Sequence, residues 1–321
     1  MADIPVPVSN RTQHPRRKPD VPMLPDAAPA SPASGSKRPL WRRPSGVAVT
    51  LLLCVLGVVF LSPLLWMINA SLRPEARVLD FPPGMSVLGP QWSNYQHVLA
   101  IIPRNFLNSV RLAAFNVVGS LVVASMAGFG FARLHFPGRD ALFGAILLTA
   151  IIPNVVYIIP QFIIFQKIGW IDTFYPLWVP QVLTPVFGTF IMRQAFKTLP
   201  LDYEEAARVD GASTFRIFLT IMLPQAKAGL AAVATFSFLS SWNDLFGPIV
   251  FLNSGDKQTL PVALAQFQGE FFTQVSLLMA GATITIVPVL LVFVIAQRFF
   301  IQGLSGGIKA WCHRVSAPLG W

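Results

Sequence analysis

The chain has 321 residues, of which 54% are hydrophobic and only 12% are Asp, Glu, Lys or Arg. A soluble protein of this length has about twice that fraction of charged residues, because its surface must face water. The composition therefore excludes an ordinary cytosolic enzyme and a disordered protein, and it indicates an integral membrane protein. We attribute the net charge of +10 to basic residues retained on one side of the membrane rather than to nucleic-acid binding.

The first 45 residues are polar and rich in Pro, Ala and Ser, with basic clusters such as Arg16-Arg17-Lys18 and Arg42-Arg43. Such a segment cannot bury enough apolar surface to fold. A secretory signal peptide would place its apolar region much nearer the start of the chain. We therefore expect residues 1–45 to be a disordered, basic cytoplasmic tail.

Six apolar stretches of membrane-spanning length follow this tail, and none of them is interrupted by Lys or Arg. A helix of about 17–25 residues crosses the hydrocarbon core, where every backbone polar group must be bonded internally. The strands of a membrane barrel would be shorter and would alternate in polarity. The pattern predicts an all-α integral membrane protein with six transmembrane helices, at approximately 47–68, 112–131, 141–165, 174–192, 230–252 and 277–296.

The distribution of Lys and Arg predicts the orientation of these helices. With the N-terminus in the cytoplasm, most basic residues stay inside, as is usual for membrane proteins. Both termini are then cytoplasmic: residues 46–103 contain the first helix and an external loop, 104–297 form the transmembrane core, and 298–321 form a second cytoplasmic tail. The basic residues left outside are Arg73, Arg77, Arg104, Arg111, Lys167 and Lys257.

Two of the stretches contain residues that shape their helices. Small residues between positions 119 and 130 permit close helix contact in the second stretch. Pro153 and Pro160 predict a bent third helix, because proline leaves a backbone carbonyl without its helical partner. The neighbouring Asn154 and Gln161 fit either a solute pathway or a packed kink.

The segment 199–226, between the fourth and fifth stretches, is predicted to form two short helices joined by a turn. Asp202 followed by Glu205 is typical of a capping-box start. Gly211 suits the left-handed position after a helix, and Ser213 can cap the second helix. The segment should therefore be a compact hairpin on the cytoplasmic side.

The two arms of this hairpin differ in character. The second arm is expected to end at Pro224 and to bear an apolar stripe at helical spacing, formed by Phe215, Phe218, Leu219 and Met222. The first arm is acidic, with Asp202, Glu204, Glu205 and Asp210. Helices that lie on a membrane surface favour a basic polar face, so docking to a protein partner is the better interpretation.

These residues resemble the signature loop of the inner-membrane permease subunits of ABC importers. That loop reads Glu-Ala-Ala, three residues, Gly, nine residues, Ile, one residue and Leu-Pro, and the chain matches every spacing. The resemblance covers roughly residues 47–310. The runs at 241–244, 251–253 and 297–309 resemble the sugar-type, MalG-like branch, although this chain continues past the usual end of that branch to Trp321.

The resemblance implies the type I transmembrane fold of ABC importers, with a pair of coupling helices that docks on a cytoplasmic ATPase. In this interpretation Ala206 and Ala207 permit close approach, Glu205 offers a charge to the partner, and Gly211 makes the turn. The residues assigned to ATPase coupling are Glu205, Ala206, Ala207, Asp210, Gly211, Ile221, Leu223 and Pro224.

The sequence contains no phosphate-binding loop of the form Gly-x-x-x-x-Gly-Lys-Ser/Thr, no His/Cys metal cluster and no Gly-x-Ser-x-Gly elbow. We therefore expect no catalytic residue, metal or cofactor in this chain, with ATP and Mg held by partner ATPase subunits. The resemblance also implies a second permease subunit, an extracytoplasmic solute-binding protein and the lipid of the inner membrane as partners.

The predicted function is that of an inner-membrane permease subunit in an ATP-driven importer for sugars. Asn243 and Asp244 are candidates for the solute path, because an acid at the bilayer centre costs about 2.5–3.5 kcal/mol and normally faces protein or water. A structural hydrogen bond is the other interpretation of Asp244, and Gln161 and Asn154 are further candidates. The alternatives are a permease for glycerol phosphate, a polyol or a peptide, an ion-coupled carrier, which usually shows internal repeats, and a membrane scaffold.

Overall fold

The computed structural model describes residues 44–80, 89–269 and 274–315. Within these ranges the chain consists of helices and their connections, without a β-strand, which confirms the predicted all-α class. The expected N-terminal tail up to residue 43, parts of two expected outer loops (81–88 and 270–273) and residues 316–321 lie outside the described residues.

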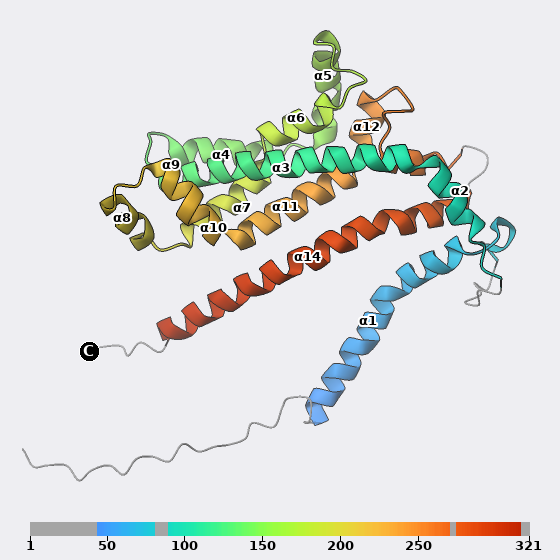
Figure 1. Cartoon of the computed structure of the whole chain (residues 1–321), viewed down its shortest axis with the longest axis horizontal. Helices are drawn as coiled ribbons and strands as arrows, with labels where there is room; N and C mark the ends of the chain where they lie inside the picture. The colour runs from blue at the N-terminus through green and yellow to red at the C-terminus, as the bar shows by residue number, and fades with distance from the viewer. Residues whose placement is uncertain (1–43, 81–88, 270–273, 316–321) are drawn as a thin grey trace, which may run out of the picture. The chain divides into compact units, whose positions relative to one another are not determined.

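Figure 1 labels the helices, which run in chain order as follows. They are α1 (Pro44–Ser71), η2 (Glu75–Arg77), α2 (Ser93–Ile101), α3 (Pro103–Arg133), α4 (Arg139–Thr149), α5 (Asn154–Lys167), α6 (Tyr175–Leu183), α7 (Val186–Lys197), α8 (Asp202–Val209), α9 (Thr214–Ile217), η3 (Phe218–Met222), α10 (Leu223–Gln225), α11 (Lys227–Trp242), α12 (Phe246–Phe251), α13 (Leu260–Ala265) and α14 (Val275–Val315). Helix α14 thus continues past residue 296, into the segment expected to be a tail.

The chain divides into two units, Met1–Val58 and Val59–Trp321. The described part of the first unit is the N-terminal part of α1, whose apolar side chains are almost all exposed. A helix that is apolar on all sides and not covered by its own chain is typical of a segment that faces lipid. The second unit contains the rest of α1 and all later helices.

Among the described residues, three helices are long and apolar enough to cross a membrane: α1 over Val47–Ser71, α3 over Pro103–Arg133 and α14 over Val275–Phe299. Two bent helix pairs raise the number to as many as five if each pair counts as one span. These are α4 with α5, bent by 92°, and the α9–α10 segment with α11, bent by 80°. The structure therefore shows three to five such spans where the sequence predicted six.

The difference arises because three of the predicted stretches are divided. The break between α4 and α5 covers residues 150–153 and ends at Pro153, which confirms the predicted bend in the third stretch. The break between α6 and α7 comes at Thr184, just before Pro185, with φ −128° and ψ 61°. A residue before proline is forced out of the helical region. The fifth stretch is divided at residues 243–245, between α11 and α12.

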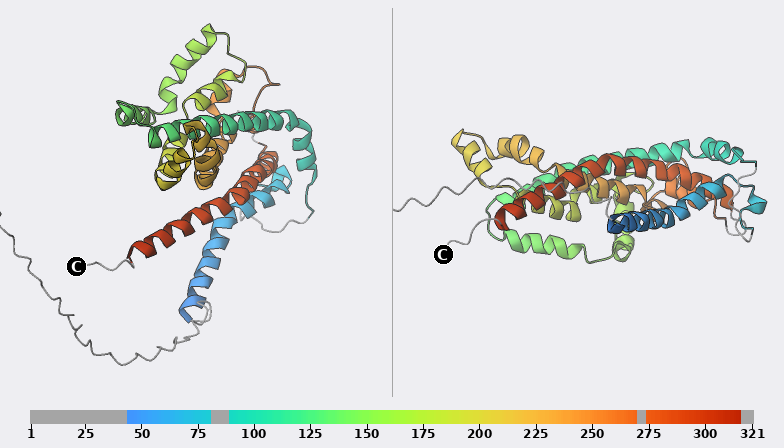
Figure 2. Two further views of the ribbon diagram at one scale, coloured as in Figure 1. Left: turned by 60° about the vertical axis from the view of Figure 1, so that its left-hand side comes forward. Right: turned by 90° about the horizontal axis from the view of Figure 1, so that it is seen from below.

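Helix α3 is the central helix of the second unit and packs along α7 and α11 (Figures 1 and 2). The contact with α7 is very close at Gly128, where an added Cβ would lie 2.5 Å from Cβ of Met192 and 2.9 Å from the backbone nitrogen of Arg193. At Gly188 an added Cβ would lie 3.0 Å from Cβ of Ala124. The predicted close contact through small residues is therefore confirmed.

We expect Gly128→Ala to destabilise the protein by about 1–3 kcal/mol, the usual effect of overpacking. The added methyl group meets backbone atoms of α7, which cannot move aside as a flexible side chain can. Gly130→Ala is the matched control, because nothing lies within 4 Å of an added Cβ there. The measurement is thermal unfolding of the purified protein in detergent, and equal melting temperatures for the two variants would contradict the prediction.

Candidate functional site

A helical hairpin lies at the C-terminal end of α3 (Figure 1). Its first arm is α8, and its second arm consists of α9, the π-helical turn η3 and α10. The predicted two-helix hairpin within residues 199–226 is therefore confirmed. The second arm ends at Gln225, one residue after Pro224, and the chain then bends by 80° into α11.

The turn between the two arms has the predicted chemistry. Gly211 adopts a left-handed conformation with φ +78°. Its N–H donates to the carbonyl of Arg208 at 3.0 Å, and the N–H of Ala212 donates to the carbonyl of Ala207 at 2.9 Å. These two hydrogen bonds form a Schellman motif. The hydroxyl oxygen of Ser213 accepts from the N–H of Arg216 at 3.4 Å and caps α9, as expected.

The start of α8 differs from the predicted capping box. Leu201 occupies the N-cap position with a helical backbone (φ −69°, ψ −28°), and no side chain among the described residues caps this end. The carbonyl of Leu201 accepts from the N–H groups of Glu204 and Glu205 at 2.8 Å and 3.1 Å. Asp202 therefore lies in the first turn, where its charge interacts favourably with the helix dipole, and it is not the cap.

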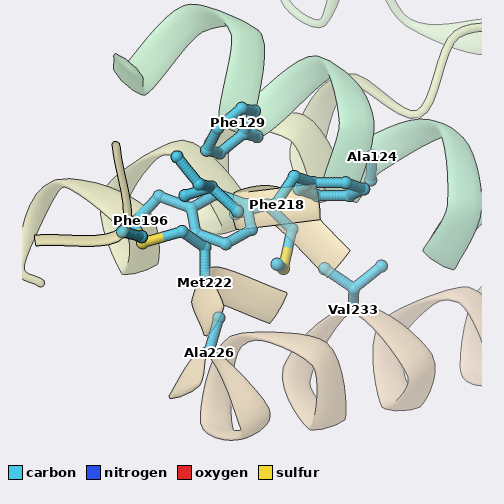
Figure 3. Close-up of a cluster of buried hydrophobic side chains, with 10 residues drawn as sticks. Ala124, Phe129, Phe196, Phe218, Met222, Ala226 and Val233 are labelled. Carbon is cyan, nitrogen blue, oxygen red and sulfur yellow. The ribbon is translucent and has the colours of Figure 1, made fainter. Parts of the chain in front are cut away.

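The second arm packs onto α3 and α7 through a cluster of buried apolar side chains (Figure 3). The ring centroid of Phe218 lies 5.1 Å from that of Phe129 on α3 and 6.2 Å from that of Phe196 on α7. Met222 and Ile217 are fully buried beside it. This cluster fixes the second arm to the membrane helices.

The four residues of the apolar stripe predicted for the second arm do not share one buried face. Phe218 and Met222 are buried, but Phe215 is 61% exposed and Leu219 is 43% exposed. Ile217 is buried instead. The physical reason is η3, because a π-helical turn does not follow the spacing of 3.6 residues per turn on which the prediction depends.

Glu204 and Arg133 form a buried ion pair beneath the first arm. The Nε atom of Arg133 lies 3.0 Å from Oε1 of Glu204, and the two side chains are 6% and 7% exposed. The Nη2 atom of Arg133 also donates to the carbonyl oxygens of Phe196 and Leu199, at 2.6 Å each. Each charge is thus paired, which is the condition under which a buried charge is tolerated.

The ion pair joins the ends of three helices. Arg133 is the last residue of α3, and its donors reach carbonyls at the C-terminal end of α7. Helix dipoles favour a cation at both of these ends. Glu204 lies in the first turn of α8, where the dipole favours an anion. The charges therefore suit all three helix ends at once.

A second arginine ties the same end of α3 to α4. Nη2 of Arg193, on α7, lies 2.8 Å from Oδ1 of Asp140 on α4, and its Nε donates to the carbonyl of Phe131 at 3.3 Å. The guanidinium group also lies 4.0 Å from the ring centroid of Phe143, a cation–π contact. The helices around the hairpin are thus joined by two arginines.

The eight residues assigned to ATPase coupling do not share one surface. Ala207 is buried in the protein's own core, and Ile221 and Leu223 are half-buried. Ala207 therefore packs against the membrane helices rather than facing outward. The exposed members are Glu205, Ala206, Asp210, Gly211 and Pro224.

Sequence reasoning assigned a role to Glu205 and missed Glu204 and Arg133. Helix α8 has an unusual distribution of residues, because it buries a glutamate and exposes Tyr203 and Val209. One signal was available: Glu204 lies three residues before Ala207, and positions i and i+3 share a face of a helix. A second signal was Arg133, because it is a basic residue at the end of a long apolar helix.

Near the N-terminal end of α3, Asp172 binds the segment 252–260. Its Oδ1 atom accepts from the backbone N–H groups of Asn253 and Ser254 at 3.0 Å and 2.9 Å. Its Oδ2 atom accepts from the hydroxyl of Ser254 at 2.5 Å and from Nζ of Lys257 at 2.8 Å. The hydrogen bonds from Lys257 and Ser254 hold the pKa of the Asp172 carboxyl well below its usual value. This residue was not among those predicted.

Helix α3 holds the same segment from the other side. Nδ2 of Asn108 donates to the carbonyls of Asp256 and Gln258 at 3.0 Å and 3.1 Å. The hydroxyl oxygen of Ser109 accepts from the N–H of Leu260 at 2.8 Å. Because α3 has 31 residues, it is about 46 Å long at 1.5 Å per residue. One helix therefore contacts the segment 252–260 near one end and the hairpin at the other.

The four candidates for the solute path lie in two groups. Asn154 and Gln161 are on α5, where Asn154 accepts a hydrogen bond from the hydroxyl of Tyr157. Asn243 and Asp244 lie in the connection between α11 and α12, and Oδ1 of Asp244 accepts from the N–H of Gly247 at 3.1 Å. This bond stabilises the start of α12 and supports the structural interpretation of Asp244. Asn243 is exposed.

The residues just before Asn243 join helices to one another. Nδ2 of Asn116 on α3 donates to the hydroxyl of Ser241 at 2.9 Å, and Nε1 of Trp242 donates to the carbonyl of Thr285 on α14 at 3.2 Å. Polar side chains commonly link membrane helices in this way. Of the run 241–244, Asn243 is the exposed residue.

We expect Asp172→Ala to release the segment 252–260. Without the carboxylate, two backbone N–H groups lose their acceptor, and the Lys257 ammonium keeps only the backbone carbonyl of residue 172. Amide hydrogen exchange at residues 253–257 should rise severalfold, while exchange in α3 should not change. Because the pKa of Asp172 is lowered in the folded state, the contribution of its carboxylate is present at neutral pH and is lost only as the pH falls below about 4.

Asp256→Ala is the control for this experiment. Asp256 pairs with Arg104 at 3.2 Å, but the side chains are 46% and 70% exposed. Such surface pairs contribute about 0–1 kcal/mol, so hydrogen exchange should barely change. If both variants showed the same protection as the unaltered protein, Asp172 would not hold the segment.

Comparison with known proteins identifies a family of related sequences. Residues 120–306 match the family model described as "Binding-protein-dependent transport system inner membrane component". The chain is 34% identical over 272 residues to the arabinooligosaccharides transport system permease protein AraQ of Halalkalibacterium halodurans, which covers 80% of this chain and 96% of that protein. It is 31% identical to the trehalose transport system permease protein SugB of Mycobacterium tuberculosis, with 79% and 93% covered.

A third relative is the diacetylchitobiose uptake system permease protein NgcG of Streptomyces coelicolor, 32% identical with 80% of this chain and 86% of that protein covered. Among solved structures, the chain resembles one chain of a bacterial ABC transporter that imports the acidic polysaccharide alginate. The TM-score is 0.67 at 23% identity, with 80% of this chain and 96% of that chain covered. This likeness shows that the two chains share a fold.

Proposed function

Because this chain belongs to the family of binding-protein-dependent transport system inner membrane components, we propose that it is a permease subunit of an ATP-driven ABC importer for sugars. It forms half of the translocation path together with a second permease subunit. The hairpin within residues 199–226 docks on a cytoplasmic ATPase subunit that binds ATP and Mg. A soluble binding protein delivers the solute on the opposite side of the membrane, and both termini are cytoplasmic.

The exposed apolar surface of the hairpin is the observation that supports docking to the ATPase. Val209 is 88% exposed, Phe215 61% and Tyr203 49%. Large apolar side chains left uncovered on a folded hairpin mark a surface for another protein. The exposed carboxylates of Glu205 and Asp210 add a polar rim, which is the usual anatomy of an interface.

The substrate class is proposed from the relatives. The names of three of them refer to arabinooligosaccharides, trehalose and diacetylchitobiose, all of which are carbohydrates. The exposed amide of Asn243 is suited to such a solute, since it can both donate and accept hydrogen bonds with hydroxyl groups. We assign Asn243 to the solute path before Asp244, which already holds the N–H of Gly247.

Reconstitution into liposomes tests the proposed function. The chain is combined with its second permease, ATPase subunits and binding protein, and uptake of radiolabelled arabinooligosaccharides, trehalose and diacetylchitobiose is measured. Uptake of at least one sugar should require both ATP and the binding protein and should persist when ion gradients are collapsed. Uptake that follows a proton or sodium gradient without ATP would instead identify an ion-coupled carrier.

We expect Gly211→Val to abolish co-purification of the ATPase while the protein still inserts into the membrane. Gly211 has φ +78°, a conformation that is a genuine outlier for a β-branched residue. The turn would change and move the two arms apart. The measurement is the amount of ATPase that co-purifies with the membrane-extracted protein.

Gly169→Val is the matched control, because Gly169 has a similar φ of +73° but lies between α5 and α6. It imposes the same kind of backbone strain away from the hairpin, so the ATPase should still co-purify. If the ATPase co-purified normally with the Gly211→Val variant, the hairpin would not be part of the surface that binds the ATPase.

A further inference from the structure

Helix α3 is a continuous rod that connects the two sites described above. Its proline, Pro103, is at the first position, where proline does not interrupt a helix. Neighbouring helices are broken at 150–153, 184–185 and 243–245. A displacement applied to one end of α3 is therefore carried to its other end, whereas a broken helix can absorb it by bending.

We propose that the Glu204–Arg133 ion pair is the joint through which movement of the hairpin reaches α3 and, along α3, the segment 252–260. The inference rests on the proposed function, because the movement is attributed to an ATPase docked on the hairpin. Glu204 and Arg133 act as positioning residues in this scheme, and neither is exposed enough to contact the partner.

The two arms of the hairpin differ in how much apolar contact attaches them to the membrane helices, because the first arm contributes only Ala207 to the buried cluster. The second arm is held by the apolar cluster around Phe218. Helix α8, which is described in full, buries two residues, Glu204 and the small Ala207. The first arm therefore depends mainly on its ion pair for attachment.

The ion pair also links α8 to a guanidinium group that is itself held in place by hydrogen bonds. Apolar packing has no preferred direction, whereas a guanidinium group presents its donors in a rigid plane. Nε of Arg133 meets Glu204 while Nη2 meets the carbonyls of Phe196 and Leu199. Rotation of α8 therefore has to move the end of α3 or separate two buried opposite charges.

Two adjacent glutamates allow docking and transmission to be tested separately. Glu205 is exposed on the face that we assign to the ATPase, whereas Glu204 is 5% exposed and faces the protein's own core. Glu204→Gln keeps the size of the side chain and an acceptor oxygen but removes the charge. Glu205→Gln makes the same chemical change on the outer face.

The experiment uses the assembled complex and a thiol probe at the far end of α3. The probe is introduced by Asn253→Cys, at an exposed position, in a background with Cys54→Ser and Cys312→Ser. Its rate of reaction with a maleimide is compared with and without Mg-ATP and vanadate. In the background protein, we expect Mg-ATP and vanadate to change the rate of the maleimide reaction by about fivefold or more. A change of this size is typical of two coupled sites.

With Glu204→Gln we expect this nucleotide effect to fall to less than about twofold, while the ATPase still co-purifies. Glu205→Gln should weaken co-purification instead. A purely structural role for Glu204 would lower the melting temperature of the complex and leave the nucleotide effect in the folded fraction unchanged, and that outcome would overturn the proposal.

Arg133→Lys provides a second test if Glu204→Gln does not fold. Lysine keeps the positive charge, but a single ammonium group cannot reproduce the planar fork that serves the carboxylate and two carbonyls. We expect the same loss of the nucleotide effect. A full nucleotide effect in a folded Arg133→Lys complex would refute the role of the ion pair as the joint.

The background protein separates failure of the proposed function from failure of the inference. If it did not bind an ATPase, the proposed coupling would be refuted. If it bound the ATPase but position 253 did not respond to nucleotide, the route along α3 would be refuted.

Discussion

The position of the hairpin depends on how the chain satisfies one buried guanidinium group. Arg133 ends a helix of 31 residues, and its side chain is 6% exposed. A charge in such a place is tolerated only if it is paired and hydrogen-bonded. The carbonyls of Phe196 and Leu199 accept hydrogen bonds from the guanidinium group, and the carboxylate of Glu204 is its counter-charge. Because Glu204 faces inward, the opposite face of α8 faces outward, and this sets which side chains the hairpin leaves exposed.

The same constraint explains why α8 exposes apolar residues. In an ordinary amphipathic helix the apolar face is buried and the polar face meets water. Here Glu204 and Ala207 occupy the inner face, so Tyr203 and Val209 remain outside. An exposed apolar face is unfavourable in water unless another protein covers it. The ion pair and the exposed face are thus two consequences of one orientation of the helix.

The features that the sequence predicted are local ones. The apolar stretches, the hairpin, the left-handed Gly211 and the Ser213 cap each follow from the chemistry of a few neighbouring residues. The features that it did not predict depend on residues far apart in the chain. Glu204 meets a partner 71 positions earlier, and Asp172 meets the segment 252–260, about 80 positions later. The breaks in the fourth and fifth stretches were also not predicted, because mean hydropathy over a stretch does not change where the backbone turns.

Polar residues in the described part of the chain have two distinct roles, and their separation supports movement of the helices as units. Asn116, Ser241 and Trp242 form hydrogen bonds between helices within the membrane region, where no water competes for their donors. Such bonds keep α3, α11 and α14 together. The charged groups instead lie at helix ends, where Arg133 and Arg193 connect α3 to α8, α7 and α4. Because these charged contacts lie near helix ends and α3 itself is unbroken, the proposed force on the hairpin would act on α3 as a whole.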